Sequence, residues 1–260
     1  MDKKEILKKI IQKKEFSELP KKDVETAFGK FDKEHYSDEE KIKLTRALLL
    51  KVFSFSLSKR LLTVKNKDPE WFLKKHVSTR DRFSNYNEIY KRIFKSKKTE
   101  EEKRTVFDFG AGVNGFSYEY FKRIGLNVNY VGVEAIGQLV KTVNNYFKRE
   151  KISGEVFHLS LFQLEKLKKL ILKYKGLKIV FLFKTIDSLE LLERNYTKKF
   201  LIEISPLVDK IVVSFATRSL IKRTRFKAKR SWLINFLREN FNVLDDFEVS
   251  GERYIVFRKE

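Results

Sequence analysis

A glycine-rich turn is the first place where this chain could bind a ligand. Residues 108–115 read Asp-Phe-Gly-Ala-Gly-Val-Asn-Gly, and the three glycines follow the spacing G-x-G-x-x-G. Because glycine carries no Cβ, the backbone of such a turn can approach a ligand closely. We therefore expect Asp108, Gly110, Ala111 and Gly112 to form the floor of a nucleoside-binding site.

A carboxylate that follows in the sequence favours a nucleoside. Glu134 ends the next apolar run, where it can accept hydrogen bonds from both ribose hydroxyls. The glycine spacing alone does not separate such a ligand from a dinucleotide, whose pyrophosphate binds at the same kind of turn. The Asp-x-Gly-x-Gly pattern that begins at Asp108, the basic excess of the chain and the C-terminal hairpin described below together favour S-adenosyl-L-methionine as the cofactor.

The elements that must position these residues follow an alternating pattern. After Arg104, short β-branched apolar runs alternate with amphipathic segments, as in a parallel sheet covered by helices. The last two strands are joined at Ser250-Gly251 as an antiparallel hairpin. Strands are expected at Thr105–Phe109, Asn129–Glu134, Glu155–Leu159, Lys178–Phe183, Lys210–Ser214, Asn242–Val249 and Glu252–Arg258. Residues 99–260 are thus predicted to form the α/β, Rossmann-like sheet of the S-adenosylmethionine methyltransferases.

The first 98 residues have a different pattern and are predicted to form a helical N-terminal domain. Apolar residues recur there at helical spacing, and Gly29 is the one glycine. Turn signals at 17–20, 36–38 and 66–69 divide the region into short helices. We expect the helix that begins near Pro69 to carry His76 through Arg82, and the charged stretch from Lys95 to Arg104 to link the two domains.

The charge of the chain points to a polyanionic partner. It has 57 Lys and Arg against 35 Asp and Glu, a formal charge of +22. RNA, DNA and anionic membrane surfaces are the candidates. From Arg218 to Arg238 there is no acidic residue, so we expect this stretch to hold RNA phosphates beside the cofactor. The expected RNA-binding residues are Arg218, Lys222, Arg223, Arg225 and Lys227.

Several classes of protein are disfavoured by what the sequence lacks. There is no cysteine, which excludes disulfides, thiolate zinc sites and a cysteine nucleophile. The three histidines are scattered, and no metal is expected. No run approaches the roughly 20 apolar residues of a membrane span, and the first residues do not resemble a signal peptide. We therefore expect a cytoplasmic protein.

Four segments together resemble one known family, the 16S rRNA (guanine-N7) methyltransferases of the aminoglycoside-resistance type. The segments are His-Val-Ser-Thr-Arg-Asp-Arg at 76–82, Val-Phe-Asp-Phe-Gly-Ala-Gly-Val-Asn at 106–114, Phe-Leu-Phe-Lys at 181–184 and Val-Ser-Phe-Ala-Thr-Arg-Ser-Leu at 213–220. The resemblance extends from about Trp71 to the C-terminus. It implies a monomeric enzyme that methylates a guanine in the decoding A-site of 16S rRNA, with a helical N-terminal extension that docks on the small (30S) ribosomal subunit.

The resemblance also assigns roles to individual residues. It implies that Arg82 binds the methionine carboxylate of the cofactor, that His76 and Thr79 shape this side of the pocket, and that Gly110 lines the methionine and ribose region. Glu134 would hold the ribose. The chain departs from the family where an Asp is expected near the adenine, because it has Ser160 there, and we expect the Ser160 hydroxyl to hydrogen-bond the adenine instead. It also departs in the loop after Ser219, which is not glycine-rich.

The acceptor atom can be narrowed by chemistry. Carbon-5 methylation of pyrimidines needs a nucleophile, normally cysteine, and the Asp/Asn-Pro-Pro-aromatic motif of exocyclic-amine enzymes and the Lys-Asp-Lys-Glu set of ribose enzymes are absent. Guanine N7 has an available lone pair and needs positioning more than a base. We expect Phe183 and Lys184 to line the target pocket, with the ring of Phe183 stacking on a flipped base.

Three other functions remain open. They are methylation of another rRNA base such as adenine N1, a non-catalytic RNA-binding ribosome assembly factor, and a nicotinamide-dependent oxidoreductase. The sequence also leaves open whether the modification serves drug resistance or routine ribosome maturation.

Overall fold

One seven-stranded sheet organises the chain. The computed structural model describes residues 1–53, 67–95, 103–218 and 230–260. Within them the strand order is β3-β2-β1-β4-β5-β7-β6, with β1 to β5 parallel and β6 and β7 antiparallel. The strands are β1 Arg104–Phe109, β2 Val128–Glu134, β3 Gly154–His158, β4 Leu177–Phe183, β5 Lys210–Ala216, β6 Asn242–Val249 and β7 Glu252–Arg258. All seven predicted strands and the C-terminal hairpin are confirmed.

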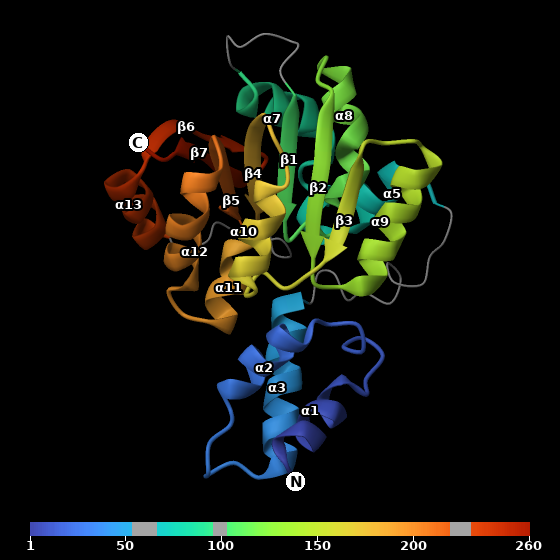
Figure 1. Cartoon of the computed structure of the whole chain (residues 1–260), viewed down its shortest axis with the longest axis vertical. Coiled ribbons are helices and arrows are strands. Elements are labelled where there is room, and N and C mark those ends of the chain that lie inside the picture. Colours follow the sequence, from blue (N-terminus) through green and yellow to red (C-terminus); the bar gives the residue numbers. More distant parts are fainter. Residues whose placement is uncertain (54–66, 96–102, 219–229) are drawn as a thin grey trace.

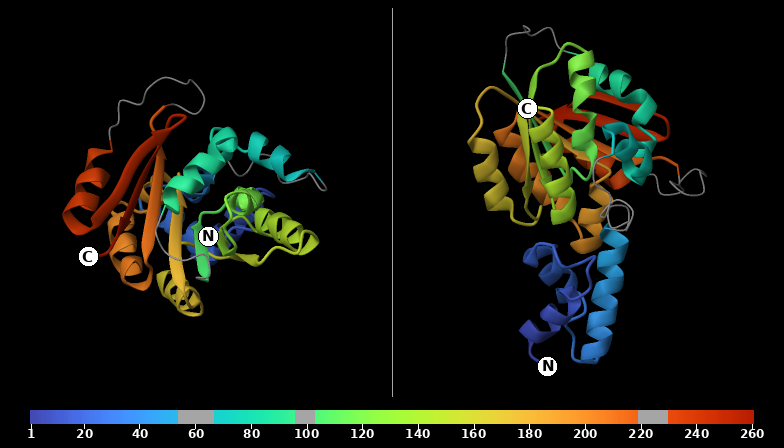
Figure 2. Two further views of the ribbon diagram at one scale, coloured as in Figure 1. Left: turned by 90° about the horizontal axis from the view of Figure 1, so that it is seen from above. Right: turned by 90° about the vertical axis from the view of Figure 1, so that its right-hand side faces the viewer.

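Helices cover both faces of the sheet, which explains why the central strands are apolar along most of their length. β1 begins at Arg104, so Arg104 belongs to the sheet and not to the predicted linker, and every later residue of β1 is buried. Seen from above, α7 to α9 lie on one face and α10 to α13 on the other (Figure 2). The covering helices are α7 Tyr86–Ile93, α8 Tyr118–Arg123, α9 Gly137–Arg149, α10 Leu164–Leu172, α11 Ile186–Leu192, α12 Tyr196–Ile204 and α13 Ser231–Asn240.

The first three helices form a small bundle below the carboxyl ends of the parallel strands (Figure 1). They are α1 Lys3–Ile11, α2 Lys21–Gly29 and α3 Asp38–Phe53, separated at two of the predicted turn signals. Both α2 and α3 contact α11. The Lys30 ammonium donates to the carbonyl of Leu191 at 2.6 Å, and Lys141 of α9 pairs with Glu18 at 2.9 Å. The bundle is therefore attached to the edge of the sheet where ligands bind in open α/β folds.

The remaining N-terminal helices pack on the sheet domain instead. They are α5 Pro69–Lys75, α6 Val77–Arg80, the 3-10 turn η1 Phe83–Asn85 and α7. Tyr90 of α7 stacks on Phe121 with ring centroids 4.1 Å apart, and Phe72 of α5 stacks on Phe116 at 4.3 Å. Residues 1–98 thus do not pack as one unit, and the predicted domain boundary near residue 98 lies outside the described residues.

One local expectation about a helix was wrong. The helix that begins at Pro69 does not continue to Arg82, because His76 has extended backbone angles (φ −76°, ψ 124°) and separates α5 from α6. After the glycine turn, a short 3-10 segment, η2 Asn114–Ser117, precedes α8, which begins at Tyr118.

Candidate functional site

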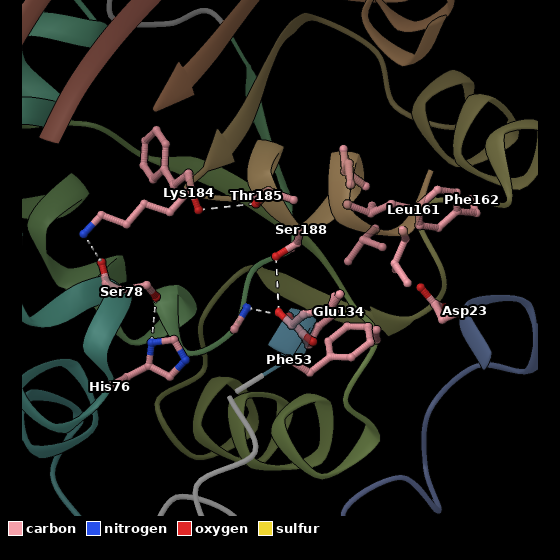
Figure 3. Close-up of a pocket in the computed structure, with 18 residues that line it drawn as sticks. Asp23, Phe53, His76, Ser78, Glu134, Leu161, Phe162, Lys184, Thr185 and Ser188 are labelled. Carbon is pink, nitrogen blue, oxygen red and sulfur yellow. Dashed lines mark hydrogen bonds between the residues drawn. The ribbon is translucent and has the colours of Figure 1, made fainter. Parts of the chain in front are cut away.

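A pocket of about 730 Å³, part of it open to solvent, lies at the carboxyl ends of β1, β2 and β4. Figure 3 shows its labelled residues in order, with His76, Ser78 and Lys184 at one end, Glu134 in the middle and Asp23 at the other end. The lining residues are Asp23, Val52, Phe53, His76, Ser78, Gly110, Gly112, Val133, Glu134, Ala135, Leu161, Phe162, Phe183, Lys184, Thr185, Ser188, Leu189 and Leu192.

The glycine turn forms the floor of this pocket. Gly110 and Gly112 have left-handed backbone angles, with φ of +77° and +51°. A Cβ on Gly110 would lie 2.7 Å from Oγ1 of Thr185, and one on Gly112 would lie 3.5 Å from the ring of His76. Ala111 is buried in the turn and its N–H donates to the carbonyl of Val133. Both glycines are therefore needed for the shape of the floor.

Glu134 presents an oriented carboxylate to the middle of the pocket. Its Oε2 accepts the Gly112 N–H at 2.7 Å, and its Oε1 accepts the Ile136 N–H at 2.9 Å. Burial raises the pKa of Glu134, and these backbone hydrogen bonds oppose the rise. Each carboxylate oxygen keeps a second acceptor site, so two vicinal hydroxyls can still donate to it.

The end of the pocket at Lys184 holds a lysine ammonium that pairs with the carboxylates of Asp81 and Glu252. Lys184 follows β4 with φ +57°, and its ammonium lies 3.2 Å from the carbonyl oxygen of Ser78, which accepts its hydrogen bond, and 3.1 Å from Oε2 of Glu252. Nδ1 of His76 hydrogen-bonds the Ser78 hydroxyl at 2.7 Å. Burial, together with the nearby cations Arg82 and Lys184, lowers the pKa of His76 to about 3. The imidazole is therefore neutral, and Lys184 is the cation of this end.

Arg82 and Asp108 lie beneath the floor rather than in the lining. The Arg82 guanidinium pairs with Glu252 at 3.1 Å and donates to Oδ1 of Asn114 at 3.0 Å, and the arginine side chain is 2% exposed. Asp108 accepts hydrogen bonds from Asn114 and from the hydroxyl of Tyr130. Arg82 is thus not part of the pocket lining in the ligand-free structure, and its contact with the methionine carboxylate stays a prediction.

Two more predicted residues support the pocket from behind. The Thr79 hydroxyl donates to the carbonyl of Leu73 at 2.8 Å, so this side chain fixes the segment between α5 and α6. Ser160 is fully buried, and its Oγ accepts the N–H of Phe162 at 3.1 Å. Neither Thr79 nor Ser160 is part of the lining.

The ring of Phe183 is packed among other side chains, and its stacking on a target base stays a prediction. It stacks on Phe181 with centroids 4.5 Å apart, meets Tyr254 edge to face at 5.7 Å, and has the Arg82 guanidinium 4.9 Å from its centroid. Phe183 is 5% exposed and still forms part of the pocket lining. The strand residue is held in the core because its neighbours on β4 and β7 are aromatic too.

The largest omission from the sequence predictions is Asp23, which reaches the pocket from α2 and is 3% exposed. The available signal was its register, since Asp23 lies four residues before Ala27, on the buried face of α2. Phe53 at the end of α3 also lines the pocket. The N-terminal bundle therefore contributes residues to a site that the sequence assigned to the sheet domain and to residues 76–82.

Of the expected RNA-binding residues, the structure describes Arg218 alone. Its side chain is exposed and lies beside Gly251 in the β6–β7 turn, with its Cδ 3.3 Å from where a Cβ of Gly251 would be. Lys222, Arg223, Arg225 and Lys227 lie outside the described residues. Among the described helices, none has the length and apolar character of a membrane span.

The comparisons with known proteins agree with this fold. No family model matches the chain. A curated relative from Proteus mirabilis, a 16S rRNA (guanine(1405)-N(7))-methyltransferase, is 31% identical over 152 residues, which are 48% of this chain and 53% of the relative. The matched region thus spans about half the length of that protein.

Solved structures match over the whole chain. The 16S rRNA methylase RmtB has a TM-score of 0.76 at 17% identity, covering 100% of this chain and 99% of its own. The 16S rRNA methyltransferase RmtF in complex with S-adenosyl-L-homocysteine has a TM-score of 0.74 at 18% identity, covering 100% of both chains. An rRNA methylase from Escherichia coli has a TM-score of 0.71 at 17% identity, covering 99% of each chain. The predicted methyltransferase fold, with its helical N-terminal region, is confirmed.

Proposed function

We propose that this protein is an S-adenosyl-L-methionine-dependent methyltransferase that acts on guanine N7 in the decoding A-site of 16S rRNA. The observation that carries the proposal is the order of groups along the pocket, with Lys184 at one end, the glycine floor and Glu134 in the middle and an apolar region beyond. This order matches the carboxylate, ribose and purine of the cofactor. The sequence resemblance and the methylase relatives support the same reading.

The pocket residues have separate roles in cofactor binding. Glu134 accepts hydrogen bonds from the two ribose hydroxyls. Gly110 and Gly112 allow the ligand to lie against the backbone. Lys184 attracts the amino-acid carboxylate, a role that the sequence resemblance placed on Arg82. Arg82 is a positioning residue, because it shares Glu252 with Lys184 and so helps to hold that lysine in place.

The described pocket suits an acceptor that has no proton to lose. S-adenosyl-L-methionine supplies an electrophilic methyl group, and attack by guanine N7 releases S-adenosyl-L-homocysteine without a general base. His76 is a poor base here, because burial and the cations Arg82 and Lys184 lower its pKa to about 3, and both carboxylate oxygens of Glu134 already accept backbone N–H groups. Phe183 and Lys184 border the side on which the acceptor must enter.

The small ribosomal subunit is the proposed partner, and the protein is proposed to act as a cytoplasmic monomer. The charge of +22 suits RNA. Exposed lysines on the N-terminal bundle add a docking surface, which comprises Lys8, Lys13, Lys14, Lys21 and Lys22. The basic segment after β5 is proposed to hold RNA beside the methyl group.

The test of the function is to map the methyl group. Purified 30S subunits are incubated with the protein and labelled S-adenosyl-L-methionine, and the 16S rRNA is mapped by mass spectrometry and primer extension. Label at N7 of an A-site guanine supports the proposal, and label at adenine N1 or at another site contradicts the target. Calorimetry that detects NAD(H) binding but no binding of the sulfonium cofactor would favour an oxidoreductase. Absence of both would favour a non-catalytic assembly factor.

The RNA-binding role of the basic segment has its own test. Three cations are neutralised together, namely Arg223, Arg225 and Lys227. Fewer phosphate contacts lower the affinity for RNA and flatten its dependence on salt concentration, whereas the affinity for S-adenosyl-L-homocysteine stays nearly unchanged. Gel-shift titrations at several salt concentrations measure both effects. RNA affinity equal to that of the parent would refute the assignment.

A further inference from the structure

Asp23 is a buried carboxylate with an unused acceptor. It lies on α2 and is 3% exposed, and its Oδ2 has no hydrogen-bond partner among the described residues. Burying an unpaired polar atom costs free energy, and such atoms in native proteins usually have a partner. The carboxylate points to the pocket, where Figure 3 shows it at the end farthest from Lys184. The site therefore contains an acceptor that is not used within the described protein.

The surroundings of Asp23 suit a flat aromatic ligand. Leu161 and Phe162 line the same end of the pocket, and both are largely buried, at 9% and 8% exposure. The nearby hydroxyl of Ser160 accepts the N–H of Phe162 and interacts with the carboxylate of Asp23, whose Oδ2 still has no hydrogen-bond partner among the described residues. The other carboxylate of the pocket, Glu134, has both oxygens held by backbone N–H groups. Asp23 is thus the polar group that is left to distinguish one ring from another.

The position of α2 is fixed by contacts on both sides of the residue. Glu18, before the helix, pairs with Lys141 of α9, and its carboxylate lies so close to Gly137 that a Cβ there would be 2.4 Å from Oε2. Lys30, after the helix, donates to the carbonyl of Leu191 at 2.6 Å. These contacts attach α2 to the α9 and α11 sides of the site, so Asp23 is held against the pocket by the sheet domain itself.

We propose that Asp23 recognises the purine of the cofactor by accepting a hydrogen bond from its exocyclic amine, so that a helix of the N-terminal bundle determines cofactor specificity. The inference rests on the proposed function, which places the ribose at Glu134 and hence the purine at the Asp23 end. An amine donates a hydrogen bond to the carboxylate. A keto oxygen at the same ring position cannot donate, so it and the carboxylate oxygen would repel each other. A site built to pair with a polar group rejects the analogue that cannot pair.

The test compares two product-like ligands that differ at this one ring position. S-adenosyl-L-homocysteine carries the amine, and S-inosyl-L-homocysteine carries a keto oxygen. Calorimetry at pH 8.5, above the pKa of about 7 that burial gives Asp23, measures the affinity ratio for the parent, Asp23→Ala and Asp23→Asn. Glu25→Gln is the matched control, because Glu25 lies on the same helix but pairs with Lys21 and does not line the pocket.

The parent and the control are expected to prefer the adenosyl ligand by at least about tenfold, the effect of one hydrogen bond to a charged group. Asp23→Ala lowers affinity for the adenosyl ligand about tenfold and brings the ratio close to one. Asp23→Asn keeps the volume of the side chain and also lowers the ratio, since an amide donates to a keto oxygen. Circular dichroism establishes that each variant is folded.

The outcomes separate the two proposals. A parent that binds the adenosyl ligand, together with folded variants that keep the parent's ratio, overturns the role of Asp23 and leaves the proposed function standing. A parent without preference between the ligands also overturns that role. A parent that binds neither ligand overturns the proposed function and the inference together.

Discussion

Replacing Asp23 with Asn should stabilise the unliganded protein, and increasingly so as the pH rises. Burial, opposed by a hydrogen bond from Ser160 and aided by the nearby Glu134 carboxylate, raises the pKa of Asp23 from 3.8 to about 7. Between these values the native state holds a proton that the unfolded state has released. The stability of the parent therefore falls as the pH rises from about 4 to about 7, whereas the amide does not titrate.

The size of the effect follows from the shift. About three pH units at roughly 1.36 kcal/mol each correspond to about 4 kcal/mol between acid and alkaline pH. Between pH 5 and pH 8 about 3 kcal/mol of this remains. For a 260-residue chain, unfolding entropies of about 2.1 cal/mol/K per residue convert that difference to a change of about 5 °C in Tm.

Thermal unfolding of the parent, Asp23→Asn and Glu25→Gln at pH 5, 6, 7 and 8 measures this difference. The advantage of Asp23→Asn over the parent should grow by about 5 °C over the series, and Glu25→Gln should follow the parent. A difference between Asp23→Asn and the parent that is the same at every pH would refute the reasoning, because it would mean that the buried carboxylate has its ordinary pKa.

Three further predictions concern the floor and the charged end of the pocket. Gly110→Ala should weaken S-adenosyl-L-homocysteine binding and lower Tm more than the control Gly125→Ala, because Gly125 has a similar φ of +76° but open space for a Cβ. Equal losses for the two variants in calorimetry and thermal unfolding would contradict the close approach of Gly110 to Thr185. Lys184→Met should weaken binding of S-adenosyl-L-homocysteine about tenfold but leave binding of methylthioadenosine unchanged, because the latter lacks the amino-acid carboxylate. An equal loss of affinity for both ligands would mean that this carboxylate binds elsewhere. Glu252→Gln should cost about 3–5 kcal/mol in denaturant unfolding, because Arg82 and Lys184 both lose the buried carboxylate that they share. A cost below about 1 kcal/mol would mean that the pairs are not formed.

The pH dependence of Glu252 has the opposite sign from that of Asp23. Burial would raise the pKa of Glu252, but the charges of Arg82 and Lys184 outweigh it and lower that pKa below its usual value. A carboxyl with a lowered native pKa contributes stability above its unfolded pKa, and this contribution is lost as the pH falls through the native value. As the pH falls, Asp23 therefore contributes more to the stability of the folded protein and Glu252 contributes less.

Local patterns were sufficient to predict the sheet. The strands β6 and β7 were predicted with the bounds that the structure has, because alternating residues and the Ser250-Gly251 turn specify a hairpin without distant contacts. Pro69 was also predicted correctly from a local signal near the start of a helix, because its fixed φ and missing N–H suit the first turn of a helix. The glycine turn and Glu134 follow strands that end at the same edge of a parallel sheet, so they were predicted to meet.

The roles of single charged residues were decided by partners far away in the sequence. Arg82 is 170 residues from Glu252, and no spacing rule predicts that this carboxylate pairs with its guanidinium. The surroundings of Phe183 were decided in the same way, because Phe181 and Tyr254 from two strands pack around its ring. A sequence pattern assigns a residue to an element and a face, but it does not say which distant side chain will satisfy its charge or cover its surface.

From the sequence alone, the chain could be identified as a parallel α/β sheet with a C-terminal hairpin, a nucleoside-type turn and a strong basic excess. These features depend on neighbours within a few residues or on composition. Only the tertiary structure showed that the pocket is completed by Asp23 from the N-terminal bundle. That placement depends on contacts such as Lys30 with Leu191 and Glu18 with Lys141, which form between segments more than 120 residues apart once the chain has folded.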